Sequence, residues 1–404
     1  MRKCILTFIV ALTLFTTALF LCAQIPASAL KENYEKSAEI LCEKPVFFEI
    51  FDGAEDSRID RYADSILLNI SYHYDGSMKS VMESAYYYQE TQNENENLRD
   101  AVKGDLPANR QYLRYWHGSS VLVRLFHLIG NIRLMYVVNA ILLVGGIVLL
   151  LLLLFRKHLV SVAVSLIFAL VMGSIWFTPF CLEYSWTILI AIYTAVFVLW
   201  KEGDHYPVFL LSGMLAAYLD FLTTETLTLL LPLLLLIAIE ERKGMVRKNI
   251  LRGCAWIAGY ILTWLAKWVI AAIVLGGNVL PSIMENAQER IGGSIGVSLP
   301  EYLIGAIVRN VRCLFPFQYG IAGIFGGIAL AVFVAYWIFV YRKRGADRTY
   351  ILVLLLLAAV PLLRFLVLRN HSYLHFFFTF RALTASVLGI GLVVCELTSS
   401  KRKA

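Results

Sequence analysis

The side chains most able to do chemistry are acidic, and they gather in one short run from Asp52 to Asp64. Within that run, Asp60 and Asp64 are four residues apart, so on a helix they would share one face. Two carboxylates placed this way raise each other's pKa, or bind a cation or a cationic partner. A carboxylate beside a substrate hydroxyl can also serve as a general base. Asp60 and Asp64 are therefore candidate catalytic residues; the alternative is a solvated acidic face with N-cap residues, neutralised by Arg58 and Arg61.

A basic and aromatic run follows, from Asn109 to Gly118. Its arginines, Arg110 and Arg114, have the planar guanidinium that binds phosphate in a bidentate way. The interleaved Tyr, Trp and His117 side chains suit stacking on sugars or a position at the level of the lipid headgroups. We name Arg110, Arg114 and His117 as candidate phosphate or sugar contacts. The alternative is an aromatic and basic belt at the membrane surface.

A third group consists of ionisable residues inside or beside the apolar segments of the chain. The expected topology puts all of them in the outer half of the membrane or just beyond it: Asp220, Glu225, Lys267, Arg364, Arg369, His371, His375 and Arg381. Charges at such depth are costly and face a cavity or a partner. An outward-facing site for a lipid phosphate would use Lys267, Arg364 and Arg381. The alternatives are snorkelling of the arginines, and structural pairing of Asp220 or Glu225 with Lys267.

Other chemistries find little support in the sequence. His371 and His375 have i, i+4 spacing, which alone is a weak indication of metal binding, so we predict no metal site. No cofactor is certain, although a divalent cation at the acidic run stays open. No catalytic triad and no glycine-rich phosphate loop is recognisable. Among the cysteines, Cys42, Cys181 and Cys313 should face outward, where a disulfide is conceivable.

Membrane helices must position these residues. The chain has 404 residues, of which 59% are hydrophobic, more than a soluble protein can bury. A bilayer core of about 30 Å needs about 20 apolar residues per helix, and lipid requires backbone groups to pair within that helix. The predicted fold class is an all-α polytopic membrane protein with about ten transmembrane helices. The predicted spans are Cys4–Ala23, Leu134–Phe155, Leu159–Phe177, Phe180–Trp200, Val208–Leu222, Leu227–Ile239, Ile250–Leu275, Tyr319–Tyr341, Tyr350–Leu368 and His375–Leu397.

The charges order these spans into four parts. Residues 1–23 form the first span, 24–133 an acidic loop with 17 of the 29 acidic residues, 134–397 a nine-helix membrane domain, and 398–404 a basic tail. The basic residues gather at the ends of spans that face the opposite side from the loop, which is the positive-inside pattern. We therefore expect a plasma-membrane protein with both termini in the cytoplasm and an exoplasmic loop. This placement of the charge gives no reason to expect a nucleic-acid partner.

The first span is followed by Ala27-Ser28-Ala29, a sequence similar to a signal-peptidase site. Because the apolar stretch is long enough to span the membrane, we favour a retained signal anchor over a cleaved signal. The remaining topology is the same in both cases.

Three amphipathic stretches should form helices along the outer interface of the membrane, or else pack against the loop's own core. Their apolar positions are Met78, Val81, Met82, Ala85 and Tyr86; Val121, Leu122, Leu125, Phe126 and Ile129; and Leu303, Ile307, Val311 and Leu314. Between the first two stretches, Gln89 to Asp105 is polar, and we expect it to be a mobile connection.

This layout resembles the GT-C fold, the polytopic glycosyltransferases that use polyprenyl-phosphate-linked sugars. The resemblance lies in the architecture: a first span, a long exoplasmic loop with an acidic motif, interfacial helices and many later spans. It implies that Asp60 or Asp64, in the sequence Ile59-Asp60-Arg61-Tyr62-Ala63-Asp64, is the catalytic base. It further implies that basic residues of later segments hold the donor phosphate. Many members carry adjacent acidic residues nearer the first span, whereas here Glu55-Asp56 comes some 30 residues after it.

The leading functional hypothesis is therefore a membrane glycosyltransferase. Its donor would be a polyprenyl-phosphate-linked sugar, and its acceptor an envelope glycan, lipid or protein, both meeting among the membrane lipids. The second hypothesis is a transporter or lipid flippase, which would explain the charges within the spans. The third is a non-catalytic membrane scaffold with the loop as its docking surface.

Overall fold

The computed structural model describes residues 1–277, 281, 288, 297–343 and 345–398. The chain is an all-α membrane protein, 75% helical with almost no sheet. Within the described residues, seven helices are long and apolar enough to cross a membrane. They are α1 (Arg2–Ala23), α7 (Ile132–Arg156), α9 (Leu182–Trp200), α12 (Met245–Leu275), α15 (Gly320–Tyr341), α16 (Arg348–Val367) and the run Phe376–Thr398, which comprises α18 (Phe376–Thr379), η3 (Phe380–Ala382) and α19 (Leu383–Thr398).

Three shorter apolar helices accompany them: α8 (Val160–Met172), α10 (Tyr206–Leu219) and α11 (Leu227–Ile239). Each of the ten predicted spans thus coincides with an apolar helix, although three of these helices are shorter than a bilayer core requires. The short 3-10 helix η2 (Ile175–Phe180) joins α8 to α9, and α17 (Arg369–Leu374) joins α16 to α18.

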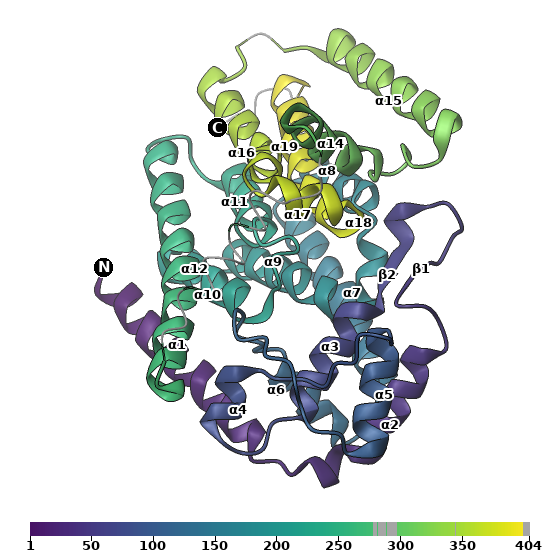
Figure 1. Ribbon diagram of the computed structural model, residues 1–404. Coiled ribbons are helices and arrows are strands. Elements are labelled where there is room, and N and C mark those ends of the chain that lie inside the picture. The colour runs from purple at the N-terminus through teal and green to yellow at the C-terminus, as the bar shows by residue number, and fades with distance from the viewer. Residues whose placement is uncertain (278–280, 282–287, 289–296, 344, 399–404) are drawn as a thin grey trace.

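The centre of the bundle is formed by α9 and α11, which pack against each other. Leu230, Leu234 and Leu235 of α11 are fully buried, and most of the other residues of this helix are nearly so. A helix that is apolar on all sides must be covered on all sides, by protein or by lipid. At the other extreme, α15 lies at the edge of the molecule, at the upper right in Figure 1, and buries only Gly323 and Gly327.

Most of the predicted loop lies beneath the bundle in Figure 1, while its residues 47–60 extend along the right side of the bundle and pack against it. It consists of α2 (Ala27–Cys42), β1 (Phe47–Glu49), η1 (Glu55–Ser57), β2 (Arg58–Asp60), α3 (Arg61–Tyr72), α4 (Met78–Glu83), α5 (Glu94–Gly104) and α6 (Ser120–His127). The antiparallel hairpin β1–β2 pairs Phe47 with Asp60. Buried side chains of α2, α3 and α5, including Leu30, Leu67 and Leu98, form a core in this region.

Helix α5 corrects the prediction that Gln89 to Asp105 is a connection without packed structure. A capping box starts the helix: the side chain of Asn93 accepts from the backbone of Glu96, and the side chain of Glu96 accepts in return. Two of its polar residues, Asn95 and Asn97, are buried, and Asn95 accepts from Ser65 Oγ at 2.7 Å and donates to Leu41 O at 2.7 Å. The sequence of α5 is polar because amide side chains such as that of Asn95, as well as apolar side chains, attach this helix to its neighbours.

The first two amphipathic stretches form α4 and α6, and the first helix is shorter than its predicted stretch. Helix α4 ends at Glu83, because Ser84 takes a left-handed conformation with φ of 49°, so Tyr86 lies beyond the helix. In α6 the polar residues Ser120, Arg124 and His127 point inward and are buried, whereas Leu125 and Ile129 are 47% and 76% exposed. Apolar residues outward and polar residues inward are what a helix at a lipid interface requires.

The third amphipathic stretch forms α14 (Leu299–Arg312). It packs against α16 and α17 and buries Tyr302, Ala306 and Asn310, a face about one residue away from the predicted one. Asn310 Nδ2 donates to Ser372 O at 2.9 Å, which fixes α14 to α17. As in α6, an apolar edge that includes Ile304 stays exposed.

Candidate functional site

The candidate base Asp60 stands at the junction of the hairpin and α3. It is the last residue of β2 and the N-cap of α3, where its Oδ1 accepts from Ala63 N at 2.8 Å. The residue is only 4% exposed, so Asp60 does not belong to a solvated face, whereas the N-cap role in that alternative is confirmed. Burial raises the pKa of Asp60 to about 7; the Ala63 hydrogen bond opposes this shift, and the nearby Asp64 carboxylate adds to it.

The second candidate, Asp64, is fully buried one turn later in α3. Its Oδ2 accepts from the Tyr136 hydroxyl at 2.6 Å, and its Oδ1 accepts from Leu182 N at 2.8 Å. Burial raises its pKa to about 6, although these hydrogen bonds favour the ionised form. Asp64 therefore ties α3 to α7 and caps the start of α9, whereas the hydrogen bond at Asp60 is local.

The two arginines that flank Asp60 serve other partners. Arg58 forms ion pairs with Glu49 and Glu55, at 3.3 Å and 3.2 Å. Arg61 donates to the carbonyls of Ile40 and Leu41 at 2.7 and 2.8 Å. Among the described residues, no ion pair joins either arginine to Asp60 or Asp64, so the expected local neutralisation reaches only Glu55 of the acidic run.

On the membrane side of the hairpin lies Arg381, one of the predicted phosphate contacts. It is 1% exposed and donates to Asp56 O at 2.9 Å and to Phe377 O at 3.2 Å. Its guanidinium also lies 4.6 Å from the ring of Tyr184. Three buried polar atoms here have no hydrogen-bond partner within the described residues: Asp56 Oδ1, Arg381 Nε and Tyr184 Oη. Each such atom is costly unless water or a ligand satisfies it.

Arg110 and Arg114 lie on a row of tyrosines at the surface of the loop region. The guanidinium of Arg110 stands 4.3 Å from the ring of Tyr88, and that of Arg114 stands 4.4 Å from the ring of Tyr112. Arg110 is exposed and Arg114 half-buried, so both present their charge near solvent. The half-exposed Tyr62, two residues beyond Asp60, lies beside the same row.

Glu94 connects this row to Asp60. It is the first residue of α5 and half-buried, and its carboxyl interacts with the Tyr62 hydroxyl and with Arg110. Burial raises the pKa of Glu94, while Tyr62 and Arg110 lower it. The charge of Glu94 also raises the pKa of Asp60. Glu94 therefore interacts electrostatically with both Asp60 and Arg110.

His117 and Lys267 meet beneath the tyrosine row. His117 Nε2 bonds to Tyr112 O at 2.9 Å, and burial lowers the pKa of this histidine to about 3, with the charges of Lys267 and Arg114 adding to the shift. It is therefore neutral at pH 7. Lys267, fully buried in α12, donates to Met82 O at 3.0 Å. The predicted pairing of Lys267 with Asp220 or Glu225 is wrong, because Lys267 donates instead to the Met82 carbonyl of the loop region.

Arg364 is bound by protein groups on all sides. It forms a bidentate ion pair with Glu225, at 2.9 and 3.1 Å, and donates to Leu222 O at 2.6 Å. Only 5% of its side chain is exposed, so the snorkelling alternative is wrong for this residue. His371 bonds to the same Leu222 carbonyl at 2.8 Å, and Asp220 caps the turn by accepting from Thr223 N at 3.1 Å. This network closes the turn between α10 and α11.

The remaining predictions concern metal and sulfur. The rings of His371 and His375 lie 4.8 Å apart, but no group of three or more possible metal ligands occurs in the part of the chain that the structure describes. All seven cysteines are free, so the conceivable disulfide among Cys42, Cys181 and Cys313 is absent.

Sequence reasoning missed Tyr62, Glu94, Tyr184 and the tyrosines at 86 to 88. Tyr62 is two residues beyond the acidic candidate and could have been found by its position. Glu94 carried only a weak signal, because its helix was read as a polar connection. Tyr184 lies in an apolar span 124 residues after Asp60, and no local pattern links the two.

No known family model, curated protein or solved structure matches this chain.

Proposed function

We propose that this protein is a membrane glycosyltransferase that transfers a sugar from a polyprenyl-phosphate donor to a hydroxyl of an envelope glycan, lipid or protein. The observation that carries the proposal is the position of Asp60, a buried carboxyl at the start of α3 one turn before the buried Asp64. A buried carboxyl with a pKa of about 7 is matched to proton transfer near neutral pH, whereas an ordinary surface aspartate is too weak a base.

The reaction needs a base on one side of the sugar and a cation on the other. Asp60 takes the proton of the acceptor hydroxyl, and the oxygen of that hydroxyl bonds to the anomeric carbon of the sugar. The bond between that carbon and the phosphate oxygen breaks, and the lipid phosphate leaves with the electron pair. Arg110 and Arg114, which present guanidinium groups near solvent, stabilise the charge of this leaving group.

The tyrosine row supports the assignment of a sugar as the transferred group. Sugars present C–H faces that pack on aromatic rings, and hydroxyls that bond to phenolic oxygens. Tyr62, Tyr88 and Tyr112 are all at least partly accessible; Tyr62 is two residues beyond Asp60, and Tyr88 and Tyr112 lie against the two arginines. By contrast Lys267, Arg364 and His117 hold the protein together in this proposal, and Arg381 positions the hairpin.

The orientation of the molecule follows from its charges. The basic ends of the spans lie in the cytoplasm of a plasma-membrane protein, as the positive-inside rule requires, and the loop region with Asp60 faces outward. Polyprenyl-phosphate sugars presented in the outer leaflet then reach the site from the membrane.

A transfer assay tests the proposal. Purified protein in lipid is given a panel of polyprenyl-phosphate-linked sugars with an acceptor mixture, and donor consumption is measured with and without a chelator of divalent cations. Asp60→Asn is expected to reduce turnover by about 10²–10⁴-fold, the usual contribution of a general base, with unchanged thermal stability or a gain. Asp52→Asn, a change of an exposed residue in the same hairpin, is the matched control and should retain full activity.

Asp64→Asn separates positioning from catalysis. This change weakens the hydrogen bonds to Tyr136 and Leu182, so it should lower the melting temperature as well as the activity. Full turnover in folded Asp60→Asn protein would rule out Asp60 as the base. No turnover with any donor, combined with substrate movement that depends on Lys267 or Asp220, would favour the transporter hypothesis.

A further inference from the structure

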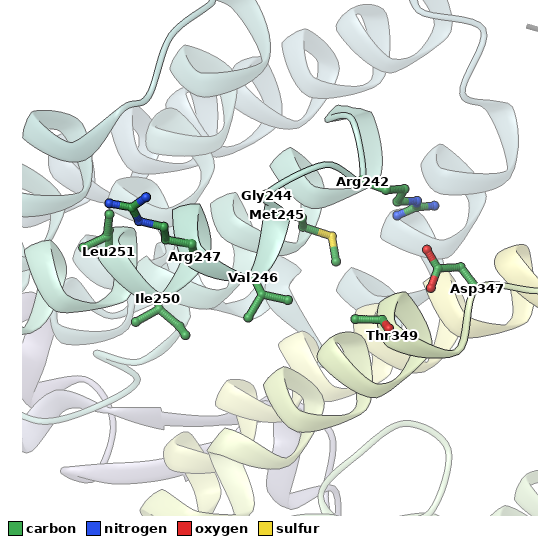
Figure 2. A pocket seen from close by; sticks show the side chains of 9 residues that line it. All are labelled: Arg242, Gly244, Met245, Val246, Arg247, Ile250, Leu251, Asp347 and Thr349. Atoms are coloured by element: carbon green, nitrogen blue, oxygen red, sulfur yellow. The ribbon is translucent and has the colours of Figure 1, made fainter.

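A cleft of about 610 Å³ lies between the starts of α12 and α16, at the end of the bundle opposite the loop region. Figure 2 shows the nine residues that line it: Arg242, Gly244, Met245, Val246, Arg247, Ile250, Leu251, Asp347 and Thr349. None of these residues belongs to the candidate glycosyltransferase site. The cleft combines cationic, backbone and apolar surfaces, and each has a distinct binding preference.

The cationic surface comes from Arg247 and Arg242. Arg247 is exposed at one end of the cleft. Arg242, at the other end, lies over the ring of Tyr350 and donates to Glu396 at 3.2 Å, so its position is fixed by the protein. The one carboxylate in the lining, Asp347, caps α16 by accepting from Tyr350 N at 3.1 Å. Two guanidinium groups against one carboxylate leave the lining with a net positive charge, and the Glu396 that pairs with Arg242 also pairs with Lys343.

The backbone surface is the start of α12. The N-cap residue is Gly244, which has a positive φ of 71°, and no side chain caps the first turn. A side chain at this position would meet nothing within 4 Å, so the approach to the first turn is open. The free N–H groups and the dipole at the start of a helix both favour an anion.

The apolar surface runs from this anion-binding end along α12. Val246, Ile250 and Leu251 are 43%, 59% and 43% exposed, and they follow one another along the side of a helix long enough to cross the membrane. An inorganic anion would leave these side chains uncovered. A ligand with a phosphate at one end and hydrocarbon at the other would cover them and satisfy the basic end as well.

We propose that this cleft binds an anionic phospholipid of the leaflet at the basic end of the bundle. The phosphate lies between Arg247 and the first turn of α12, Arg242 contributes to the headgroup, and an acyl chain covers Val246 and Ile250. The bound lipid joins the starts of α12 and α16, which belong to distant parts of the chain. This inference is independent of the proposed glycosyltransferase activity.

Lipid binding by the full-length protein tests the proposal. The purified protein is exchanged into mixtures of phosphatidylcholine with increasing phosphatidylglycerol, and the bound lipids are counted by native mass spectrometry. Wild type should retain phosphatidylglycerol preferentially. Arg247→Ala should weaken that preference by about fivefold, the effect of one basic residue near an anionic headgroup. Arg156→Ala, a basic residue at the end of α7 outside the cleft, should leave it unchanged.

Two further arms keep the result interpretable. Arg247→Gln repeats the loss of charge with a longer side chain, in case the alanine variant folds poorly. Inorganic phosphate alone is tested for its effect on melting temperature. Equal retention of the two lipids, an equal effect of Arg156→Ala, or stabilisation by inorganic phosphate that depends on Arg247 would each overturn the assignment of a phospholipid.

Discussion

Asp60 combines two duties that are seldom found in one side chain. As the N-cap of α3 it accepts a backbone hydrogen bond from Ala63, which favours the ionised carboxylate. Burial and the nearby Asp64 carboxylate both disfavour the ionised form, and the effect of burial exceeds that of the Ala63 hydrogen bond. A neutral amide could replace it as a cap but could not accept a proton, so the choice of Asp over Asn has a chemical consequence.

The raised pKa predicts how stability depends on pH. A carboxyl whose pKa rises on folding holds its proton more tightly in the folded state, so ionisation favours the unfolded state. The contribution of Asp60 to the free energy of unfolding should therefore be highest below about pH 4, the ordinary range for aspartate. It should fall as the pH rises to about 7, the pKa of folded Asp60, and then level off. Asp64, with its pKa of about 6, acts in the same direction.

Asp60→Asn should flatten this profile. The amide does not titrate, so the fall in the free energy of unfolding between pH 4 and pH 7 should shrink by an amount on the order of a few kcal/mol. The measurement is unfolding by a denaturing detergent across that range, in a non-titrating host detergent. Asp52→Asn should follow wild type. A variant profile as steep as that of wild type would show that Asp60 does not hold a raised pKa.

At the scale of elements, α10 and α12 pack closely along their lengths in the described part of the chain. Gly213 of α10 faces the backbone of Trp256, and Gly259 of α12 faces the backbone of Leu210. A Cβ at either glycine would lie 2.2 or 2.1 Å from a carbonyl oxygen, much closer than any real contact. Small residues that let helix backbones approach are typical of membrane interfaces, because lipid provides no hydrophobic drive for association.

Gly259→Ala should therefore separate these two helices. The clash involves backbone atoms, which cannot rotate away, and we expect a loss of about 1–3 kcal/mol in the free energy of unfolding. Gly253→Ala is the matched control on the same helix: its Cβ would meet nothing within 4 Å, and alanine favours helix by about 1 kcal/mol. Melting temperature and yield of monodisperse protein measure both. Equal stability of the two variants would contradict the close approach.

Hydropathy was sufficient to locate the apolar helices, because each predicted span contains enough consecutive apolar residues to be recognised without its neighbours. It could not give the packed faces. Helix α6 points Arg124 inward, where it donates to Cys22 O at 2.9 Å and also to the carbonyls of Ser71 and Ile25. A local pattern cannot anticipate that carbonyls 53 to 102 residues away will make a polar face the buried one.

The candidate site was predictable to a similar extent. Asp60, Arg110 and Arg114 could be chosen because acidic and basic residues concentrate in two short runs of the loop between the first two predicted spans. The roles of Lys267 and Arg364 could not, because their partners, Met82 and Glu225, lie far away in the sequence. A buried cation looks the same in the sequence whether a ligand or the protein neutralises it.

At the scale of the whole molecule, charge separates along the direction of the spans. The acidic hairpin lies in the loop region, whereas the basic segments from Arg242 and from Arg342 lie where α12 and α16 begin. This polarity predicts which residues face each side of the membrane. It also keeps the phospholipid cleft and the candidate glycosyltransferase site at opposite ends of the bundle.

Labelling of single cysteines in intact cells tests this polarity. In a variant that lacks the seven native cysteines, Asp52→Cys should react with a membrane-impermeant maleimide. Lys243→Cys, also exposed, should react only after permeabilisation. The opposite pattern would invert the topology and place Asp60 in the cytoplasm. Labelling of both positions in intact cells would show that the proposed membrane boundaries are wrong.

The outward-facing apolar side of α6 also bears on how the acidic loop can be studied. A soluble fragment of residues 24–133 would expose Leu125 and Ile129 without lipid, and would leave Arg124 without the Cys22 carbonyl of α1. It would also lose Tyr136 and Leu182, which hold Asp64. Antibodies raised against such a fragment would be selected on surfaces that the intact protein never displays. The immunogen of choice is the whole protein in a lipid disc.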